Sequence, residues 1–243
     1  MVIDGFWWMA MASVLAGTVY GFAGFGAALI FMPIAVMVVD PVVAVTALSV
    51  SALSSFVTLV PQAWREADKR AVLTMLGTAI AFVPLGIWLL RTTDPTVLRW
   101  SVSILALATL VILLTGWRYR QTPGTPAWLG VGAGVGFLGG ATGLNGPILI
   151  LFQLGGQDEI ARTRANTIVV LTCSGLAYLP FLALQGALTQ SSLIAGAAQL
   201  IPYGAGALVG RQLFNPGKTG LYRTIAYIMI GAAAFLGLPI WGT

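Results

Sequence analysis

The chain alternates between long apolar stretches without charge and short segments that carry its charged residues. A helix that crosses a bilayer core of ~30 Å needs ~20 residues at ~1.5 Å each. Several stretches have this length, and a longer one over 165–210 divides in two at a polar, glycine-containing cluster near 185–192. The pattern predicts six transmembrane helices, at 42–61, 71–90, 98–117, 165–184, 191–210 and 223–242.

Two further apolar runs are too long for one crossing and too short for two, and each has glycines in its middle. Glycine weakens a helix because it has no side chain to limit its backbone. We therefore expect two helical hairpins, at 5–39 and 126–155, each bent at a glycine turn. Such a hairpin is either two short tilted crossings or a re-entrant pair.

The two hairpins repeat one motif. Gly21-Phe22-x-Gly24…Pro33 in the first hairpin recurs in the second as Gly136-Phe137-x-Gly139…Pro147. Further matches follow in the same order through both halves, which indicates a duplication. Each half then holds a hairpin and three spans, and because three is odd the second half is inserted upside down. The predicted fold is an all-α polytopic membrane protein with two inverted repeats, 1–120 and 121–243.

The composition agrees with this class and narrows the chemistry. Hydrophobic residues make up 58% of the chain and charged residues 8%, whereas soluble domains have ~25% charged residues. Most of the surface must therefore face lipid, which excludes an ordinary soluble enzyme. The chain has no His, and Cys173 is its single cysteine, so a His triad, a His metal site and an intrachain disulfide are excluded. We expect no catalytic residue, no metal and no cofactor.

The few cations predict the topology. If each hairpin returns to the side where it began, the cations divide ten to two between the sides, with Arg91 and Arg99 as the minority. The ten are Arg65, Lys69, Arg70, Arg118, Arg120, Arg162, Arg164, Arg211, Lys218 and Arg223. If each hairpin crosses once, the bias disappears. The positive-inside rule therefore places the ten in the cytoplasm and both termini in the periplasm. The net charge of +5 is then mainly a topology signal, and nucleic acid is not an expected partner.

At each glycine turn a half-helix begins, near Ala27 and near Asn145. The free N–H groups and the dipole of a helix start favour an anion. Two such starts facing each other near the membrane midplane would suit a small oxyanion, to which Thr142 and Asn145 could donate hydrogen bonds. The alternative is that these glycines only allow helices to pack closely.

The element after each hairpin carries hydroxyl and amide side chains, with Ser49 and Asn166 as the best-matched pair between the halves. Such groups either line a pathway or bond only their own helix. Arg162 and Arg164, at the cytoplasmic entrance of a span, either anchor it or gather anions. The predicted substrate-binding residues are Gly24, Phe25, Gly26, Ala27, Ser49, Thr142, Gly143, Asn145, Gly146 and Asn166. No carboxylate lies mid-span, so proton coupling through a buried acid is not expected.

These features resemble the TauE/SafE family of sulfite exporters and related sulfur-anion and organosulfonate permeases. The resemblance rests on the duplicated Gly-Phe-x-Gly…Pro elements at 21–33 and 136–147, and it covers nearly the whole chain. Each element is followed by an Ala-x-Thr helix start, at Ala44 and at Ala161. The resemblance implies movement of sulfite or a small sulfonate across a bacterial inner membrane.

The leading hypothesis is a multi-pass inner-membrane transporter of a small sulfur anion, sulfite first, with that anion and the lipid bilayer as partners. One alternative is an uptake permease for an organosulfonate or another small organic anion. A second is a membrane scaffold without transport, although a scaffold would be expected to carry larger soluble loops. An intramembrane enzyme is disfavoured, because the chain has neither His nor mid-span acids.

Overall fold

The computed structural model describes residues 2–116, 124–155, 160–213 and 219–240, and within them the regular secondary structure is α-helical. The first half contains α1 (Val2–Ala23), α2 (Ala27–Val38), α3 (Pro41–Thr58), α4 (Val60–Glu66), α5 (Lys69–Thr92) and α6 (Pro95–Thr115). The second half contains α7 (Thr125–Thr142), α8 (Gly146–Gly155), α9 (Ile160–Leu184), α10 (Gln190–Leu213) and α11 (Thr219–Leu236).

Six of the described helices are long and apolar enough to cross a membrane, which confirms the prediction of an all-helical, multi-pass membrane protein. Five of them, α3, α5, α6, α9 and α10, overlap predicted spans. The sixth is α1, the first arm of the first hairpin. The span predicted at 223–242 corresponds to α11, which ends earlier, at Leu236. Residues 117 and 241–242 of the predicted spans, the cations Arg118, Arg120 and Lys218, and the side chain of Arg223 lie outside the described residues.

Each hairpin pairs a long arm with a short one, an inequality that neither predicted alternative included. The long arm α1 has 22 residues and the short arm α2 has 12, which correspond to ~33 Å and ~18 Å. In the second hairpin α7 has 18 residues and α8 has 10. The first arm therefore crosses most of a ~30 Å bilayer core, and the second turns back across about half of it.

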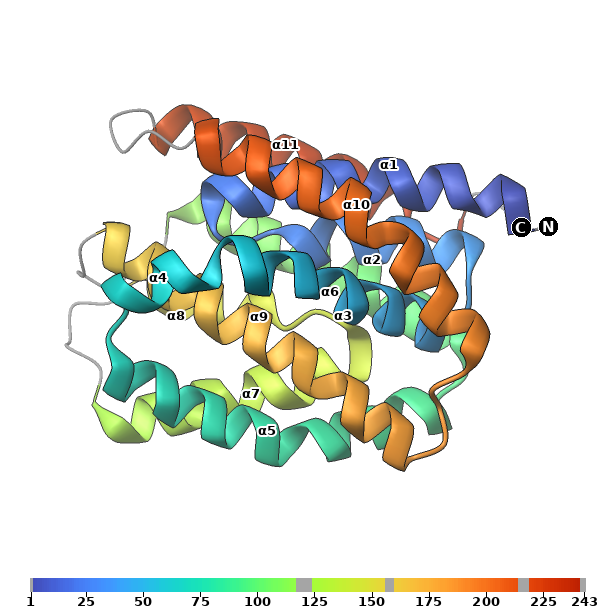
Figure 1. Cartoon of the computed structure of the whole chain (residues 1–243), viewed down its shortest axis with the longest axis horizontal. Coiled ribbons are helices and arrows are strands. Elements are labelled where there is room, and N and C mark those ends of the chain that lie inside the picture. The colour runs from blue at the N-terminus through green and yellow to red at the C-terminus, as the bar shows by residue number, and fades with distance from the viewer. Residues whose placement is uncertain (1, 117–123, 156–159, 214–218, 241–243) are drawn as a thin grey trace.

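The helix ends gather at two opposite ends of the bundle (Figure 1). At one end lie α4, the starts of α5, α7, α9 and α11, and the ends of α6, α8 and α10. At the other end lie the starts of α1, α3, α6 and α10, and the ends of α2, α5 and α9. Each hairpin therefore returns to the end at which it began. Lys69 and Arg70 in the first turn of α5 share the first end with Arg211 in the last turn of α10, whereas Arg91 closes α5 at the second.

Corresponding helices of the two halves run in opposite directions in this view. The long arm α1 begins at one end and α7 at the other, and the same holds for α3 and α9. An inverted duplication requires this arrangement. The superposition of the repeats 1–120 and 121–243, and the assignment of one end to the cytoplasm, stay predictions.

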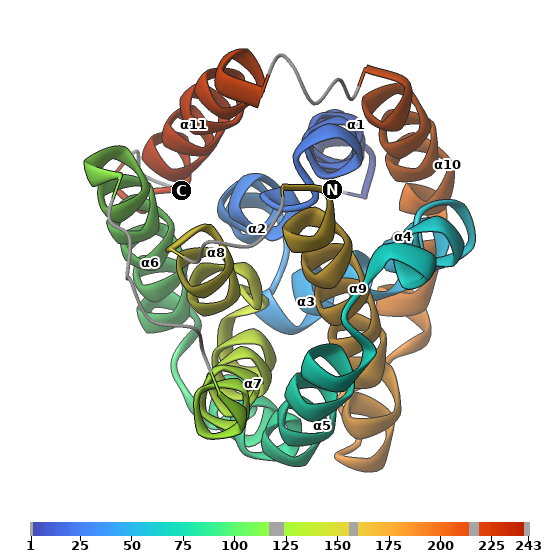
Figure 2. The same cartoon turned by 90° about the vertical axis from the view of Figure 1, so that its left-hand side faces the viewer.

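The closest helix pairs join one half to the other. Helix α1 packs along α10 and helix α7 packs along α5, with α2, α3, α8 and α9 between these two pairs (Figure 2). At both contacts a glycine faces backbone of the partner. A Cβ atom on Gly21 would meet the carbonyl oxygen of Ala207, and one on Gly136 would meet that of Ala79. Close packing through small residues is therefore the role of the first glycine in each repeated motif.

Asp-Pro pairs start two of the spanning helices. The carboxylate of Asp40 accepts the Val42 N–H group at 2.8 Å, and that of Asp94 accepts the Thr96 N–H group at 2.7 Å. Proline fits the first helical turn because its missing N–H group would have no partner there. The hydrogen bond from the Thr96 N–H group holds the pKa of Asp94 below its usual value. These caps fix where α3 begins after the first hairpin and where α6 begins after α5.

Candidate substrate-binding cavity

The break in each hairpin depends on left-handed backbone that only glycine adopts freely. Gly24 and Gly26 have φ angles of 80° and 92°, and Gly143 has a φ angle of 75°. A Cβ atom would strain each of these conformations. The glycines that form the turns are thus distinct from Gly21 and Gly136, which serve helix packing. The packing interpretation therefore holds for Gly21 and Gly136, and the anion site at the breaks stays a prediction.

The start of α2 has no side-chain cap. Its N-cap residue, Gly26, has no side chain to accept a helix N–H group. The first hydrogen bond of α2 runs from the Ile30 N–H group to the Gly26 carbonyl, at 3.1 Å. The N–H groups of Ala27, Ala28 and Leu29 come before it and have no acceptor within the helix. The start of α8 offers fewer donors, because its second residue, Pro147, has no N–H group.

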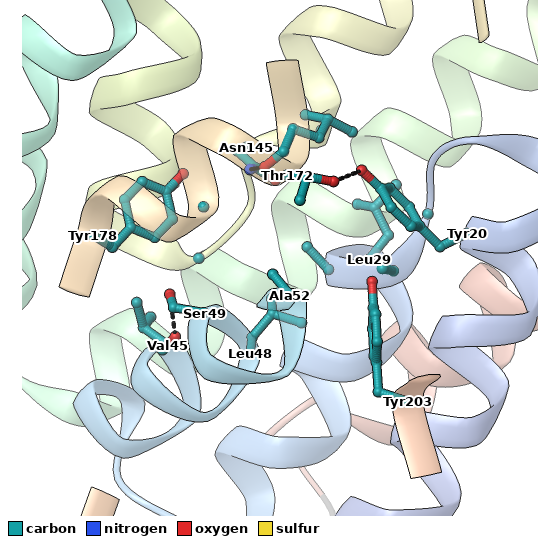
Figure 3. A pocket seen from close by; sticks show the side chains of 17 residues that line it. Tyr20, Leu29, Val45, Leu48, Ser49, Ala52, Asn145, Thr172, Tyr178 and Tyr203 are labelled. Carbon is teal, nitrogen blue, oxygen red and sulfur yellow. Dashed lines mark hydrogen bonds between the residues drawn. The ribbon is translucent and has the colours of Figure 1, made fainter. Parts of the chain in front are cut away.

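Both breaks border one cavity (Figure 3). Its described lining comes from the start of α2, the break before α8, and the helices α1, α3, α9 and α10. The cavity volume is about 40 Å³, and one water molecule needs ~10–15 Å³ on this measure. The lining residues are Tyr20, Gly26, Ala27, Ala28, Leu29, Val45, Leu48, Ser49, Ala52, Gly143, Asn145, Gly146, Leu171, Thr172, Gly175, Tyr178 and Tyr203.

The cavity lies near the middle of the spanning helices. Ser49 is close to the centre of α3, Thr172 to the centre of α9 and Tyr203 to the centre of α10. None of the described residues that line the cavity carries a formal charge. Any ion within it is therefore held by neutral donors and by the dipole at the start of α2.

Six of the ten predicted substrate-binding residues line this cavity: Gly26, Ala27, Ser49, Gly143, Asn145 and Gly146. Gly24, Phe25, Thr142 and Asn166 are outside the described lining. Gly24 and Phe25 belong to the first break, and Phe25 is buried in the core. The Thr142 hydroxyl donates to the Leu138 carbonyl at 2.8 Å and accepts the Leu144 N–H group at 3.2 Å, so it shapes the second break.

Asn145 lines the cavity, but its amide hydrogens point to α9. Its Nδ2 atom donates to the Leu171 carbonyl at 2.9 Å and to the Ser174 hydroxyl at 3.2 Å. Asn145 therefore ties the second break to α9. The Ser49 hydroxyl donates to the Val45 carbonyl of its own helix at 2.8 Å. A hydroxyl in such a bond keeps its accepting lone pairs and can rotate its hydrogen towards a ligand.

The remaining predicted residues lie towards the end of the bundle that holds α4. The Oδ1 atom of Asn166 accepts the Asp68 N–H group at 2.8 Å, which links α9 to the turn before α5. Arg164 is half-buried, and its guanidinium donates to the carbonyls of Gly21 and Phe22 in the last turn of α1. Arg162 is exposed. Of the two arginines, Arg164 thus caps a helix end, and Arg162 is placed to meet solvent ions.

Three tyrosines of the lining, Tyr20, Tyr178 and Tyr203, were absent from the prediction. Each lies in the interior of a predicted span or hairpin arm, where a tyrosine looks like core filling. The available signal was a phenol hydroxyl at mid-membrane depth, which needs a hydrogen-bond partner. Figure 3 shows Tyr178 across the cavity from Tyr20 and Tyr203. Among the described residues, no group of three His, Cys, Asp or Glu side chains could hold a metal ion.

A multi-pass helical bundle with two broken hairpins beside an uncharged, mid-span cavity is an architecture typical of secondary membrane transporters. The family described as sulfite exporter TauE/SafE matches residues 9–236. The chain therefore belongs to the TauE/SafE family, which confirms the resemblance. Members of this family are membrane transporters of sulfur-containing anions. Comparisons with curated proteins and with solved structures give no match.

Proposed function

We propose that this protein moves sulfite across the bacterial inner membrane and that the anion binds in the cavity between the two hairpin breaks. One observation carries the proposal: the starts of α2 and α8, from opposite halves of the chain, border the same cavity at mid-span. Family membership supports a sulfur anion as the substrate class. The uncapped start of α2 and the cavity beside it support a binding site at this position.

The chemistry of the lining suits an anion without a fixed counter-charge. The first-turn N–H groups of α2 lack partners within the helix, and the helix dipole makes their surroundings positive. The Ser49 hydroxyl can add a further hydrogen bond. A site without cationic side chains binds an anion less tightly than an arginine pair would. Weaker binding favours release on the far side, which a transporter requires.

The cavity volume favours a small oxyanion. A volume of about 40 Å³ accommodates roughly three or four water-sized groups. Sulfite has four heavy atoms in a compact pyramid and matches this space. An organosulfonate adds a carbon chain to the sulfonate group and needs a larger cavity.

Flux in proteoliposomes tests the substrate. Vesicles with the purified protein should take up labelled sulfite faster than empty vesicles, and excess unlabelled sulfite should compete more strongly than taurine or sulfate. Taurine uptake without sulfite uptake would favour the organosulfonate permease. If no anion moves while the protein remains folded, the scaffold alternative is supported.

Ser49→Ala tests the position of the site. The variant should weaken sulfite binding by about 3- to 10-fold, less than the loss of a full hydrogen bond to a charged group, because the Ser49 hydroxyl already has the Val45 carbonyl as an acceptor in the empty protein. Ser101→Ala is the matched control, because the Ser101 hydroxyl also donates to a carbonyl of its own helix, at 2.8 Å, and lies outside the described lining. Equal dissociation constants for sulfite in Ser49→Ala and Ser101→Ala would place the anion elsewhere.

A further inference from the structure

Two of the three tyrosines of the cavity, Tyr20 and Tyr178, differ in how their hydroxyl groups are satisfied. The Tyr20 hydroxyl lies 2.8 Å from the Thr172 hydroxyl and 3.1 Å from the Ile168 carbonyl. Tyr20 and Thr172 have two hydroxyl hydrogens and can place them on each other and on this carbonyl. This pair is therefore complete without a ligand.

The Tyr178 hydroxyl is in a different state. Tyr178 is 2% exposed, and its buried Oη atom has no partner in hydrogen-bond geometry among the described residues, although the side chains of Ser174 and Asn145 lie beside it. A buried hydroxyl without a partner costs free energy, because it has left water and gained nothing in exchange. Most buried polar groups in native proteins have a partner, so a partnerless hydroxyl at the wall of a cavity is a candidate for binding a ligand.

The surroundings of Tyr178 leave room for its hydroxyl and, among the described residues, give it neither a donor nor an acceptor in hydrogen-bond geometry. A Cβ atom on Gly139 would occupy the place of the Tyr178 Oη atom, so the glycine of α7 makes the space. Figure 3 shows the ring of Tyr178 directing its hydroxyl towards the Asn145 side of the cavity. Both hydrogens of the Asn145 amide are already donated, to Leu171 and Ser174. Asn145 therefore donates no hydrogen bond to Tyr178, and the Tyr178 hydroxyl hydrogen, which has no acceptor in hydrogen-bond geometry among the described residues, is available at the wall of the cavity.

The geometry points to Tyr178 as an anion-binding residue of the transport site, a role that rests on the proposed function. When the cavity is occupied, the Tyr178 O–H group donates a hydrogen bond to an oxygen of the anion. The N–H groups at the start of α2 hold the anion from another side. A phenol supplies this donor without adding a positive charge, so it selects an oxyanion over a cation and leaves the lining neutral.

A purely structural role predicts the opposite energetics. In that case the Tyr178 hydroxyl would bond the Oδ1 atom of Asn145 in the resting protein after a small rotation, and its removal would destabilise the fold. If the hydroxyl waits for a ligand, its removal deletes an unsatisfied buried group, and the empty protein is equally stable or more stable.

Tyr178→Phe, which removes one oxygen atom, separates these roles. Sulfite binding to the purified full-length protein is measured by calorimetry, and thermal unfolding is measured with and without sulfite. We expect the dissociation constant of sulfite to rise about 10- to 100-fold, as for the loss of a hydrogen bond to a charged group. The unfolding midpoint of the sulfite-free variant should equal or exceed that of the wild type, and the shift caused by sulfite should shrink.

Two control variants are measured beside Tyr178→Phe. Tyr20→Phe makes the same chemical change in the same cavity but breaks a satisfied pair, so it should lower the unfolding midpoint without sulfite. Ser103→Ala removes another buried hydroxyl without a partner, on α6 outside the described lining. It should leave both the midpoint and the sulfite affinity close to those of the wild type.

The outcomes distinguish this inference from the proposed function. Wild-type binding of sulfite with unchanged affinity in Tyr178→Phe overturns the role of Tyr178 and leaves the proposed function standing. A lowered midpoint of the empty variant assigns Tyr178 to the structural pair with Asn145 and also overturns the inference. Absence of sulfite binding by the folded wild-type protein overturns the proposed function, and the role of Tyr178 with it.

Discussion

Arg164 and Arg162 lie two residues apart on α9 and have different environments. Arg164 is half-buried and donates to carbonyls of Gly21 and Phe22, which lie at the end of α1 where a helix leaves its carbonyls unpaired. A cation at this position also interacts favourably with the helix dipole. Arg164 approaches the first break so closely that a Cβ atom on Gly24 would lie 2.8 Å from its Cγ atom. Arg164 therefore holds the first hairpin to α9.

Arg164→Gln should lower the free energy of unfolding by about 1.5–3 kcal/mol, the range for hydrogen bonds from charged groups. Thermal or denaturant unfolding in detergent measures the change. Arg162→Gln is the control, because Arg162 is exposed and surface substitutions usually change stability by less than about 0.5 kcal/mol. Equal stability of the two variants would contradict the capping role. A salt-dependent fall in sulfite uptake for Arg162→Gln alone would identify Arg162 as the anion-gathering residue.

The packing of α7 on α5 depends on which side of the helix each glycine occupies. Gly132, Gly136 and Gly140 face the backbone of α5, at Met75, Ala79 and Val83. Gly130 lies on the same helix, is exposed, and has open space where its Cβ atom would be. The packing therefore requires glycine at Gly136, whereas a larger residue fits at Gly130.

Gly136→Ala should destabilise the protein by about 1–3 kcal/mol, because the added methyl group forces the two helix backbones apart. Gly130→Ala should be neutral or stabilise by up to about 1 kcal/mol, because alanine has the higher helix propensity and meets no neighbour. Thermal unfolding of both variants in detergent tests the pair. A Gly136→Ala variant as stable as Gly130→Ala would show that α5 and α7 do not pack this closely.

The whole molecule separates its described cations between the two ends of the bundle. The end with α4 holds the starts of α5 and α9 and the end of α10, and these segments are rich in arginine and lysine. The opposite end holds the turns between α5 and α6 and between α9 and α10. The positive-inside rule predicts that the first end faces the cytoplasm.

Cysteine labelling in intact cells tests this orientation in a Cys173→Ser background. Ser191→Cys introduces a thiol at the exposed start of α10. This thiol should react with a membrane-impermeant reagent that is added to intact cells. A cysteine at Glu66, which is exposed at the end of α4, should react only after the membrane is opened. The reverse pattern would invert the predicted topology.

The sequence predicted the hairpins and their breaks because glycine is the residue that a left-handed turn requires. Gly26 and Gly143 could therefore be assigned to the site before any packing was known. Asn166 shows where such reasoning stops. Its match with Ser49 is a match of sequence position, but α9 meets the cavity further along, between Leu171 and Tyr178. The depth at which each helix passes the cavity depends on how the helices cross, and a repeat alignment does not contain that information.

The tyrosines of the cavity could not be predicted for a related reason. Tyr20, Tyr178 and Tyr203 come from three helices, and only the packing of α1, α9 and α10 brings them together. Their hydroxyl groups look alike in sequence. Which of them has a partner depends on neighbours such as Thr172, and on the space that a glycine leaves beside Tyr178.

Helix α1 packs on α10 and helix α5 packs on α7, so helices of one half pack against helices of the other. This pairing also constrains how the protein is synthesised and inserted. Helix α1 leaves the ribosome before α10 exists, and α5 before α7, so the packing faces of α1 and α5 enter the bilayer without their partners. The first half must therefore wait in the membrane with these faces against lipid or against another membrane protein until the second half arrives. A ribosome that stalls after α6 would leave a fragment with both faces uncovered, and quality-control proteases should remove it faster than the finished chain.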